Sequence, residues 1–238
     1  TALSLGQSAL WFLHQTDPSS AAYHTAFALR LAGPVNTDRL QIIFGKLVAR
    51  HGQLRARFPR HDGVPVTTVI ESPSLPFTVI DASAWSESEL RDRVAADYGR
   101  PFDLERDSLI RVTLYQQAGD SRAVLLCTIH HIVSDAWTNW LLLDEFRQLY
   151  TGTAELPQLT ASYPDFVRWQ QDTLSGPVGE ASWQYWQKTL AGPLPVLAMP
   201  IDFPRPAVLI PRGASVPLAV PAALFDRLKT LAQNQGTT

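Results

Sequence analysis

Two adjacent histidines end an apolar run in the segment CTIHHIVSDAWTNW, residues 127–140, and an aspartate follows four positions after the second. Imidazole has a pKa suited to proton transfer near neutral pH, so His130 or His131 could act in acid–base chemistry. The carboxylate of Asp135 could bond a backbone group, or pair with a cation and hold the shape of the loop. The segment could be a catalytic constellation, a metal site or a polar strand end.

The metal site is the weakest of these interpretations. Side chains alternate across a strand, so His130 and His131 should point to opposite faces. They cannot both bind one metal while the strand stays regular, and no other cluster of Cys, His or Asp supplies the remaining ligands. We therefore expect no metal here. A structural interpretation, with one histidine buried and hydrogen-bonded and the other exposed, stays open beside the catalytic one.

The elements around the histidines predict a mixed fold. The run RAVLLCTIHH is apolar on both faces, which predicts a central strand covered on each side. Strands are also expected in SLIRVTLYQQ, AYHTAFALRLAG, LPFTVID and ASVPLAV, with a hairpin that turns near Asp62 and Gly63. Periodicity and caps predict helices over residues 5–15, 36–52, 86–99, 137–152, 162–176, 179–192 and 221–236. Because the elements follow no regular βαβ rhythm, the fold class is α+β (mixed α/β).

Composition excludes several classes of partner. The 238 residues are 45% hydrophobic and 18% charged, with a net charge of −2, as in a folded globular protein. No block of like charges favours a nucleic-acid or acidic-lipid partner, and the longest apolar runs are too short to span a bilayer. No signal-peptide pattern opens the chain, and Cys127 is the single cysteine. We expect a cytoplasmic protein without nucleic-acid or membrane partners.

Several segments of the chain resemble motifs of one protein family. The stretch HHIVSDAW is similar to the His-His-x-x-x-Asp-Gly signature of condensation domains from nonribosomal peptide synthetases. Further segments resemble other motifs of this family and follow the order that those motifs have in the family. They are LSLGQSALWFL (3–13), RHGQLRARF (50–58), YPDFVRWQ (163–170), and YWQKTLAG with LPVLAMPIDFPRP (185–206). Together they cover essentially the whole chain.

The resemblance implies a chloramphenicol-acetyltransferase-like lobe, a mixed β-sheet covered by helices, at residues 1–192. A proline-rich connector at 193–212 would lead to the first strand and helix of a second, truncated C-terminal lobe at 213–238. An acceptor amine would attack a donor acyl or aminoacyl thioester, both held on the 4′-phosphopantetheine of carrier proteins, with no cofactor bound directly. The implied partners are the donor and acceptor carrier domains, the missing lobe, and adjacent adenylation or ketosynthase modules. The isolated chain is expected to be inactive.

The resemblance also assigns roles to residues. His131 is the expected catalytic histidine, either as general base or as the group that positions the amine and stabilises the tetrahedral intermediate. His130 would point into the lobe and support the local geometry. Asp135 would be structural and pair with an arginine, for which Arg55 is the candidate.

Three positions beside the signature carry further expectations. Ala136 stands where the family usually has glycine. If that backbone needs a positive φ, alanine costs on the order of 1 kcal/mol; otherwise the substitution is simply tolerated. Its methyl group could also narrow the tunnel beside His131. Ser134 and Trp137 are candidates for lining that tunnel, although the simpler interpretation of Trp137 is packing in the core or a loop.

Other aromatic residues fit simpler interpretations. Tyr163, Phe166 and Trp169 lie three residues apart and predict an inward-facing helix stripe. His51 and His61 lie near loop ends, where we expect them to be solvated.

Two alternative functions stay open. An epimerisation domain shares the double-histidine signature and the fold. A degenerate lobe could instead serve as a non-catalytic scaffold or carrier-docking module.

Overall fold

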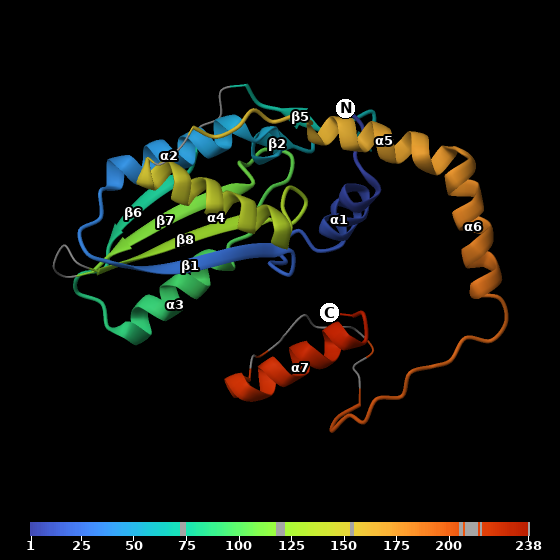
Figure 1. The fold of residues 1–238 in the computed structure, drawn as a ribbon. Helices are drawn as coiled ribbons and strands as arrows, with labels where there is room; N and C mark the ends of the chain where they lie inside the picture. The colour runs from blue at the N-terminus through green and yellow to red at the C-terminus, as the bar shows by residue number, and fades with distance from the viewer. Residues whose placement is uncertain are drawn as a thin grey trace. The chain divides into compact units, whose positions relative to one another are not determined.

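The computed structural model describes residues 1–71, 75–117, 122–152, 155–204, 207, 214 and 216–237 (Figure 1). The chain divides into two compact units, Thr1–Leu194 and Pro195–Thr238. The double histidine and the elements that surround it all belong to the first unit.

A four-stranded mixed sheet, in the order β1-β8-β7-β6, forms the centre of the first unit. Strand β8 (Arg122–His130) pairs antiparallel with β1 (His24–Ala32) on one side and with β7 (Ile110–Gln116) on the other. Strand β7 also pairs in parallel with β6 (Phe77–Asp81). The predicted central position of the histidine-bearing strand is therefore confirmed.

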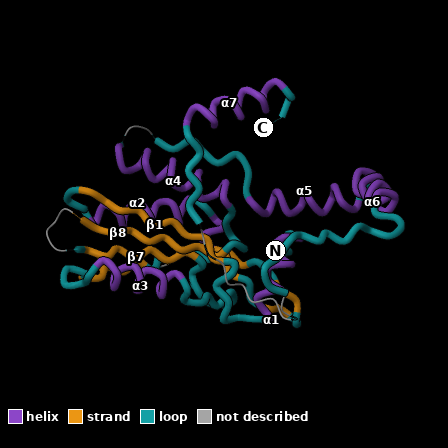
Figure 2. The backbone as a smooth tube through the Cα atoms, turned by 90° about the horizontal axis from the view of Figure 1, so that it is seen from below, coloured by secondary structure: helices purple, strands orange, loops and turns teal. Residues whose placement is uncertain are grey.

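Helices cover both faces of this sheet. Helices α2 (Thr37–Arg50) and α4 (Ala136–Thr151) lie on one face, and α3 (Glu87–Tyr98) lies on the other (Figures 1 and 2). Alternation along β8 divides its side chains between two apolar clusters: Leu125 and Ile129 pack in the larger one, and Val124 packs with the second, beneath α3. The predicted α+β class, a mixed sheet covered by helices, is confirmed.

Local signals set the ends of these elements. Asn36 caps α2 by accepting from Arg39 N at 2.9 Å, as its side-chain type predicts. Gly152 ends α4 with a φ of 68°, a conformation that glycine adopts without strain. A hairpin joins β3 (Arg60–His61) and β4 (Val64–Pro65), and its two turn residues both have positive φ, as a type I′ turn requires. These residues are Asp62 and Gly63, so the predicted turn is confirmed.

Helix α1 (Leu5–Thr16) is tied to the start of α5 (Tyr163–Ser175). The Tyr163 hydroxyl and the Ser4 hydroxyl lie 2.9 Å apart, and Leu5 N donates to the side chain of Gln170 at 2.9 Å.

The predicted inward-facing stripe of Tyr163, Phe166 and Trp169 on α5 is wrong, because the side chain of Trp169 is 61% exposed. Short strands β2 (Ala56–Arg57) and β5 (Thr68–Val69) pair with each other, and α6 (Pro177–Thr189) follows α5.

The second unit contains helix α7 (Ala222–Asn234). The strand predicted over 214–220 is wrong for residues 214 and 216–220, which the structure describes without strand pairing. Pro217 and Pro221 have no N–H group to donate to a sheet. Part of the predicted connector, residues 205, 206 and 208–212, lies outside the described residues, as do 213 and 215.

Two smaller findings complete the fold. No helix among the described parts of the chain is both long and apolar enough to cross a membrane. Cys127 is buried in the larger cluster, and burial raises the pKa of its thiol, so it packs as a small hydrophobic residue.

Three histidines meet beneath the end of β8. The ring of His130 lies 6.1 Å from that of His14 on α1 and 5.9 Å from that of His24 on β1, measured between centroids. Burial lowers the pKa of His130 to about 3, and the two neighbouring histidines add to this effect. Burial also lowers the pKa of His24, with a further contribution from Arg111, and lowers that of His14 against the opposing effect of nearby acids. The fold thus disfavours the charged form of all three rings.

We predict that acid destabilises the protein through this cluster. Between a pH of about 6.5 and about 3 the unfolded chain binds a proton at His130 and the folded chain does not, so the free energy of unfolding should fall as the pH falls through this range. The lowered pKa values of His14 and His24 act in the same direction. His130 alone should contribute up to about 1.4 kcal/mol per pH unit. Urea unfolding between about pH 7 and 5, where ordinary carboxylates stay ionised, measures this slope.

The matched variant is His130→Asn, which keeps an acceptor near the Ile132 N–H and removes the titrating ring. Its unfolding free energy should depend less on pH than that of the wild type. Equal slopes for the two proteins would contradict the assignment.

Candidate active site

The two adjacent histidines occupy opposite environments. His130, the last residue of β8, is 3% exposed, and its Nδ1 accepts a hydrogen bond from Ile132 N at 3.0 Å. His131 begins the following turn, is exposed, and lines a cavity. This is the orientation that strand alternation predicts, so His131 is the histidine that can reach a substrate.

One hydrogen bond defines the protonation of the His131 ring. Its Nδ1 lies within hydrogen-bonding distance of the Ser134 carbonyl oxygen. Because a carbonyl oxygen can only accept, Nδ1 must carry the proton, and in the neutral ring Nε2 then bears the lone pair. A neutral imidazole in this tautomer can accept a proton or a hydrogen bond at Nε2.

Several backbone contacts hold the turn that carries this ring. His131 N donates to Tyr23 O, just before strand β1, at 2.8 Å, and Val133 N donates back to His130 O at 3.1 Å. From α1, the buried Gln7 side chain donates to Ile132 O at 3.2 Å. The turn is thus anchored to the start of β1 on one side and to α1 on the other.

Sequence reasoning missed this role of Gln7. The residue sits in the family-like segment LSLGQSALWFL, and its spacing from Ser4 matches the capping box that the structure contains. That spacing was a signal for the cap. The bond from Gln7 to Ile132, 125 residues away, had no signal in the sequence.

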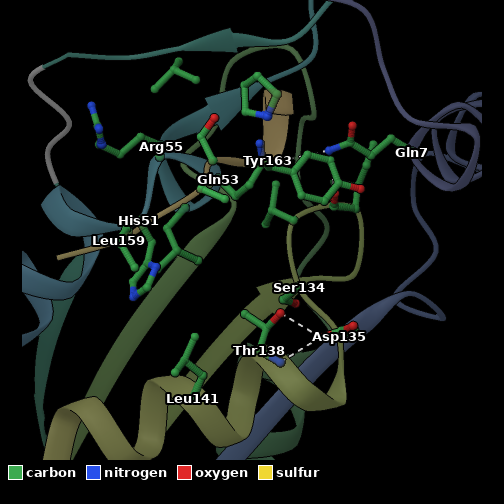
Figure 3. Close-up of a pocket in the computed structure, with 18 of the residues that line it drawn as sticks. Gln7, His51, Gln53, Arg55, Ser134, Asp135, Thr138, Leu141, Leu159 and Tyr163 are labelled. Atoms are coloured by element: carbon green, nitrogen blue, oxygen red, sulfur yellow. Dashed lines mark hydrogen bonds between the residues drawn. The ribbon is translucent and has the colours of Figure 1, made fainter. Parts of the chain in front are cut away.

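A cavity of about 830 Å³ opens beside His131. Its walls come from α1, the end of α2 with the short helix η1 (Gly52–Arg55), the turn after β8 with the start of α4, and the chain before α5 (Figure 3). Apolar side chains such as Leu141 and Leu159 line it together with polar groups. The cavity is large enough for a small organic substrate.

The predicted ion pair between Asp135 and Arg55 is wrong. Asp135 is the N-cap of α4, and its carboxylate accepts from the backbone N and the hydroxyl of Thr138, each at 2.7 Å (Figure 3). Arg55 instead donates to Ile70 O at 2.8 Å and makes no ion pair with a described carboxylate. The bonds from Thr138 lower the pKa of Asp135 below its usual range. Because Thr138 lies only three residues away in the same helix, the Asp135 carboxylate is satisfied without a long-range partner.

Ala136 carries no backbone strain. It is the first residue of α4, and Asp62 is the only non-glycine residue with a positive φ in the described chain. The conditional cost of replacing the family's glycine therefore does not arise. Alanine suits a helix better than glycine does.

Of the two candidate lining residues, Ser134 lines the cavity and is 6% exposed. Trp137 does not line it, and its side chain is 80% exposed. The interpretation of Trp137 as a core residue is therefore wrong, whereas its expected place in the tunnel between the two lobes stays a prediction. Trp137 is not among the residues that pack in the larger cluster.

A buried carboxylate next to the cavity was not predicted. Glu145 of α4 is 4% exposed and accepts from Arg50 Nε at 3.1 Å and from His51 Nε2 at 2.6 Å. The expectation of a solvated His51 is therefore wrong, whereas His61 is exposed as expected. Both Arg50 and His51 line the cavity, so their bonds to Glu145 connect this part of the cavity wall to α4. Among the described residues, no cluster of His, Cys, Asp and Glu could hold a metal ion.

We predict that Asp135 stabilises the protein as a cap. Asp135→Ala should lower the free energy of unfolding by about 1 kcal/mol, the usual cost of losing an N-cap acceptor. Asp135→Asn removes the charge but keeps the accepting oxygen, and should stay close to the wild type in urea unfolding. An asparagine variant as unstable as the alanine variant would show that an ion pair, and not the cap, is the interaction that matters.

Comparison with known proteins shows the family of this chain. The condensation domain model matches residues 1–238. The phosphinothricin tripeptide synthetase PhsC of Streptomyces viridochromogenes is 37% identical over 99% of this chain and 22% of its own length. Malpinin synthetase of Mortierella alpina is 36% identical over 99% of this chain and 3% of its own length. The chain thus spans a small part of these relatives.

Solved structures of proteins from nonribosomal peptide synthesis are also similar to this chain. The four-domain nonribosomal peptide synthetase AB3403, in its holo form with AMP and glycine, is 25% identical with a TM-score of 0.80, over 98% of this chain and 18% of that one. The first condensation domain of the calcium-dependent antibiotic synthetase, in complex with a substrate analogue, is 25% identical with a TM-score of 0.69, over 82% and 48%. Condensation domains have the chloramphenicol-acetyltransferase-like fold, so that prediction is confirmed. The motif resemblance is confirmed with it, because a match along its whole length shows that this chain belongs to the condensation domain family.

Proposed function

We propose that this chain contributes the catalytic histidine of an amide-forming condensation site in nonribosomal peptide synthesis. The observation that carries the proposal is the His131 ring, which lines the cavity with its Nδ1 bonded to the Ser134 carbonyl. Its Nε2 is therefore left to act on a substrate. Membership of the condensation domain family supports the same conclusion.

In the proposed reaction, the amine of an acceptor aminoacyl thioester attacks the carbonyl carbon of a donor acyl or aminoacyl thioester. The C–N bond forms and the donor's C–S bond breaks. The attacking amine loses one proton, which His131 Nε2 can accept and return to the departing thiolate, so that the histidine ends neutral. The same lone pair could instead hold the amine in position while the ring stabilises the tetrahedral intermediate. One tautomer serves both roles.

The substrates would arrive on the 4′-phosphopantetheine arms of donor and acceptor carrier domains. The thioester already carries the activation, so the chain needs no directly bound cofactor for this step. The synthetase relatives support carrier and adenylation domains as partners, as does the four-domain synthetase with a similar fold.

We predict that His131→Ala lowers the rate of condensation about 100-fold or more in the synthetase that carries this domain, because positioned acid–base help is lost. The measurement is dipeptidyl product on the acceptor carrier, followed by mass spectrometry after loaded donor and acceptor carriers are mixed. The matched control is His61→Ala, since the side chain of His61 is 81% exposed on a hairpin that does not line the cavity. Near-normal turnover by His131→Ala would sink the proposal.

We also predict that the 238-residue chain alone folds but forms no amide. It should fold because its sheet is buried between helices on both faces. It should not catalyse, because His131 is exposed and the reaction needs two substrates held in register, which can account for several kcal/mol of the barrier. The assay uses the purified chain with the same loaded carriers. Product at the rate of a full condensation domain, lost in His131→Ala, would prove this expectation wrong.

A further inference from the structure

Strand β1 brings a threonine hydroxyl next to the turn that carries His131. Thr25 is the second residue of β1 and is paired with Ile129, two residues before His131. As β1 is hydrogen-bonded to β8 along its whole length, the position of Thr25 relative to the end of β8 is set by the ladder. Its side chain is half-buried, and its hydroxyl bonds two groups of the neighbouring chain.

The directions of these bonds can be assigned. Thr25 Oγ1 donates to Ile129 O at 3.1 Å, because a carbonyl oxygen can only accept. Either hydroxyl can donate at the 3.0 Å contact between Thr25 Oγ1 and Ser134 Oγ, and with the Thr25 proton in the bond to Ile129 O it is the threonine that accepts there. The remaining bond that Ser134 Oγ can donate, to His130 O, is longer at 3.3 Å. Thr25 is therefore the better acceptor for the Ser134 hydroxyl.

Ser134 joins Thr25 to the imidazole. The same residue whose hydroxyl is held by Thr25 provides the carbonyl oxygen that accepts from His131 Nδ1. A buried serine hydroxyl that loses its acceptor reorients or draws the backbone with it. Any shift of the Ser134 carbonyl alters the bond that keeps the proton on Nδ1, because the tautomer of a histidine is set by the partner of its other nitrogen.

We propose that Thr25 is a positioning residue for His131: through Ser134 it fixes the tautomer and orientation of the ring that lines the cavity. The inference deepens the proposed condensation function and rests on it for its effect on rate. It makes β1, an edge strand of the four-stranded sheet, part of what keeps the lone pair on Nε2. Thr25 is not a catalytic residue in this arrangement.

The direct test is the ¹⁵N NMR spectrum of the histidine rings in the 238-residue chain, which reports the tautomer without any activity. The His131 signals are those lost in His131→Ala. In the wild type they should show a protonated Nδ1 and an unprotonated Nε2. Thr25→Val keeps the branched shape that suits a strand and removes the hydroxyl, so the His131 signals should shift toward a mixture of tautomers. Thr25→Ser restores a hydroxyl and should restore the spectrum.

Two further variants separate positioning from general loss of stability. Ser134→Ala breaks the same link from the other side and should give the same tautomer mixture as Thr25→Val, which keeps the test informative if the valine variant folds poorly. Thr113→Val removes another buried threonine hydroxyl, which donates to Asp97 of α3 at 2.6 Å and not to Ser134 or His131. It should lower the melting temperature and leave the His131 signals unchanged.

In the condensation assay, Thr25→Val should lower kcat on the order of 10-fold with little change in KM, because a misplaced catalytic group slows chemistry more than it weakens binding. An unaltered His131 tautomer in both Thr25→Val and Ser134→Ala would overturn the inference and leave the proposed function intact. A normal rate in His131→Ala would instead refute the proposed function, while the NMR result would still decide whether Thr25 positions the ring.

Discussion

The hydrogen bond from His131 Nδ1 to the Ser134 carbonyl is the constraint around which this site is organised. It closes the turn between the end of β8 and the start of α4, and it leaves the lone pair of the neutral ring on Nε2. The surrounding elements each hold one part of that turn: the chain entering β1 accepts from the His131 backbone, and α1 reaches Ile132 through Gln7. A single exposed imidazole thus depends on segments that are distant in the chain.

Burial gives the two neighbouring histidines different chemistry. His130 is packed against other rings, and desolvation lowers its pKa to about 3, so it stays neutral and serves as an acceptor for the Ile132 N–H. His131, one residue later, is exposed to the cavity. Strand alternation alone separates a buried ring from an exposed one. Burial of His130 lowers the stability of the folded protein in acid, because the unfolded chain can protonate this ring and the folded core cannot.

The charged groups near the site bond to partners close by, and not to the partners that the family resemblance implies. Asp135 satisfies its carboxylate within one turn of α4, where the unpaired N–H groups of a helix start are available. Arg55 is turned to a backbone carbonyl, and the buried carboxylate of this region is Glu145, which joins Arg50 to α4. A local cap loses little chain entropy, so it competes well with a long-range ion pair.

The sequence by itself determined what depends on near neighbours: the amphipathic helix capped by Asn36, the turn at Asp62 and Gly63, the central strand β8, and the opposite directions of His130 and His131. It also showed the family, through five motifs in order. Only the tertiary structure decided the partner of Arg55, the exposure of Trp137 and the burial of His51. It likewise decided the contact between Thr25 and Ser134, 109 residues apart. Such contacts depend on how strands and helices pack after they form, and no periodicity or spacing along the chain encodes which distant polar groups then come within about 3 Å of each other.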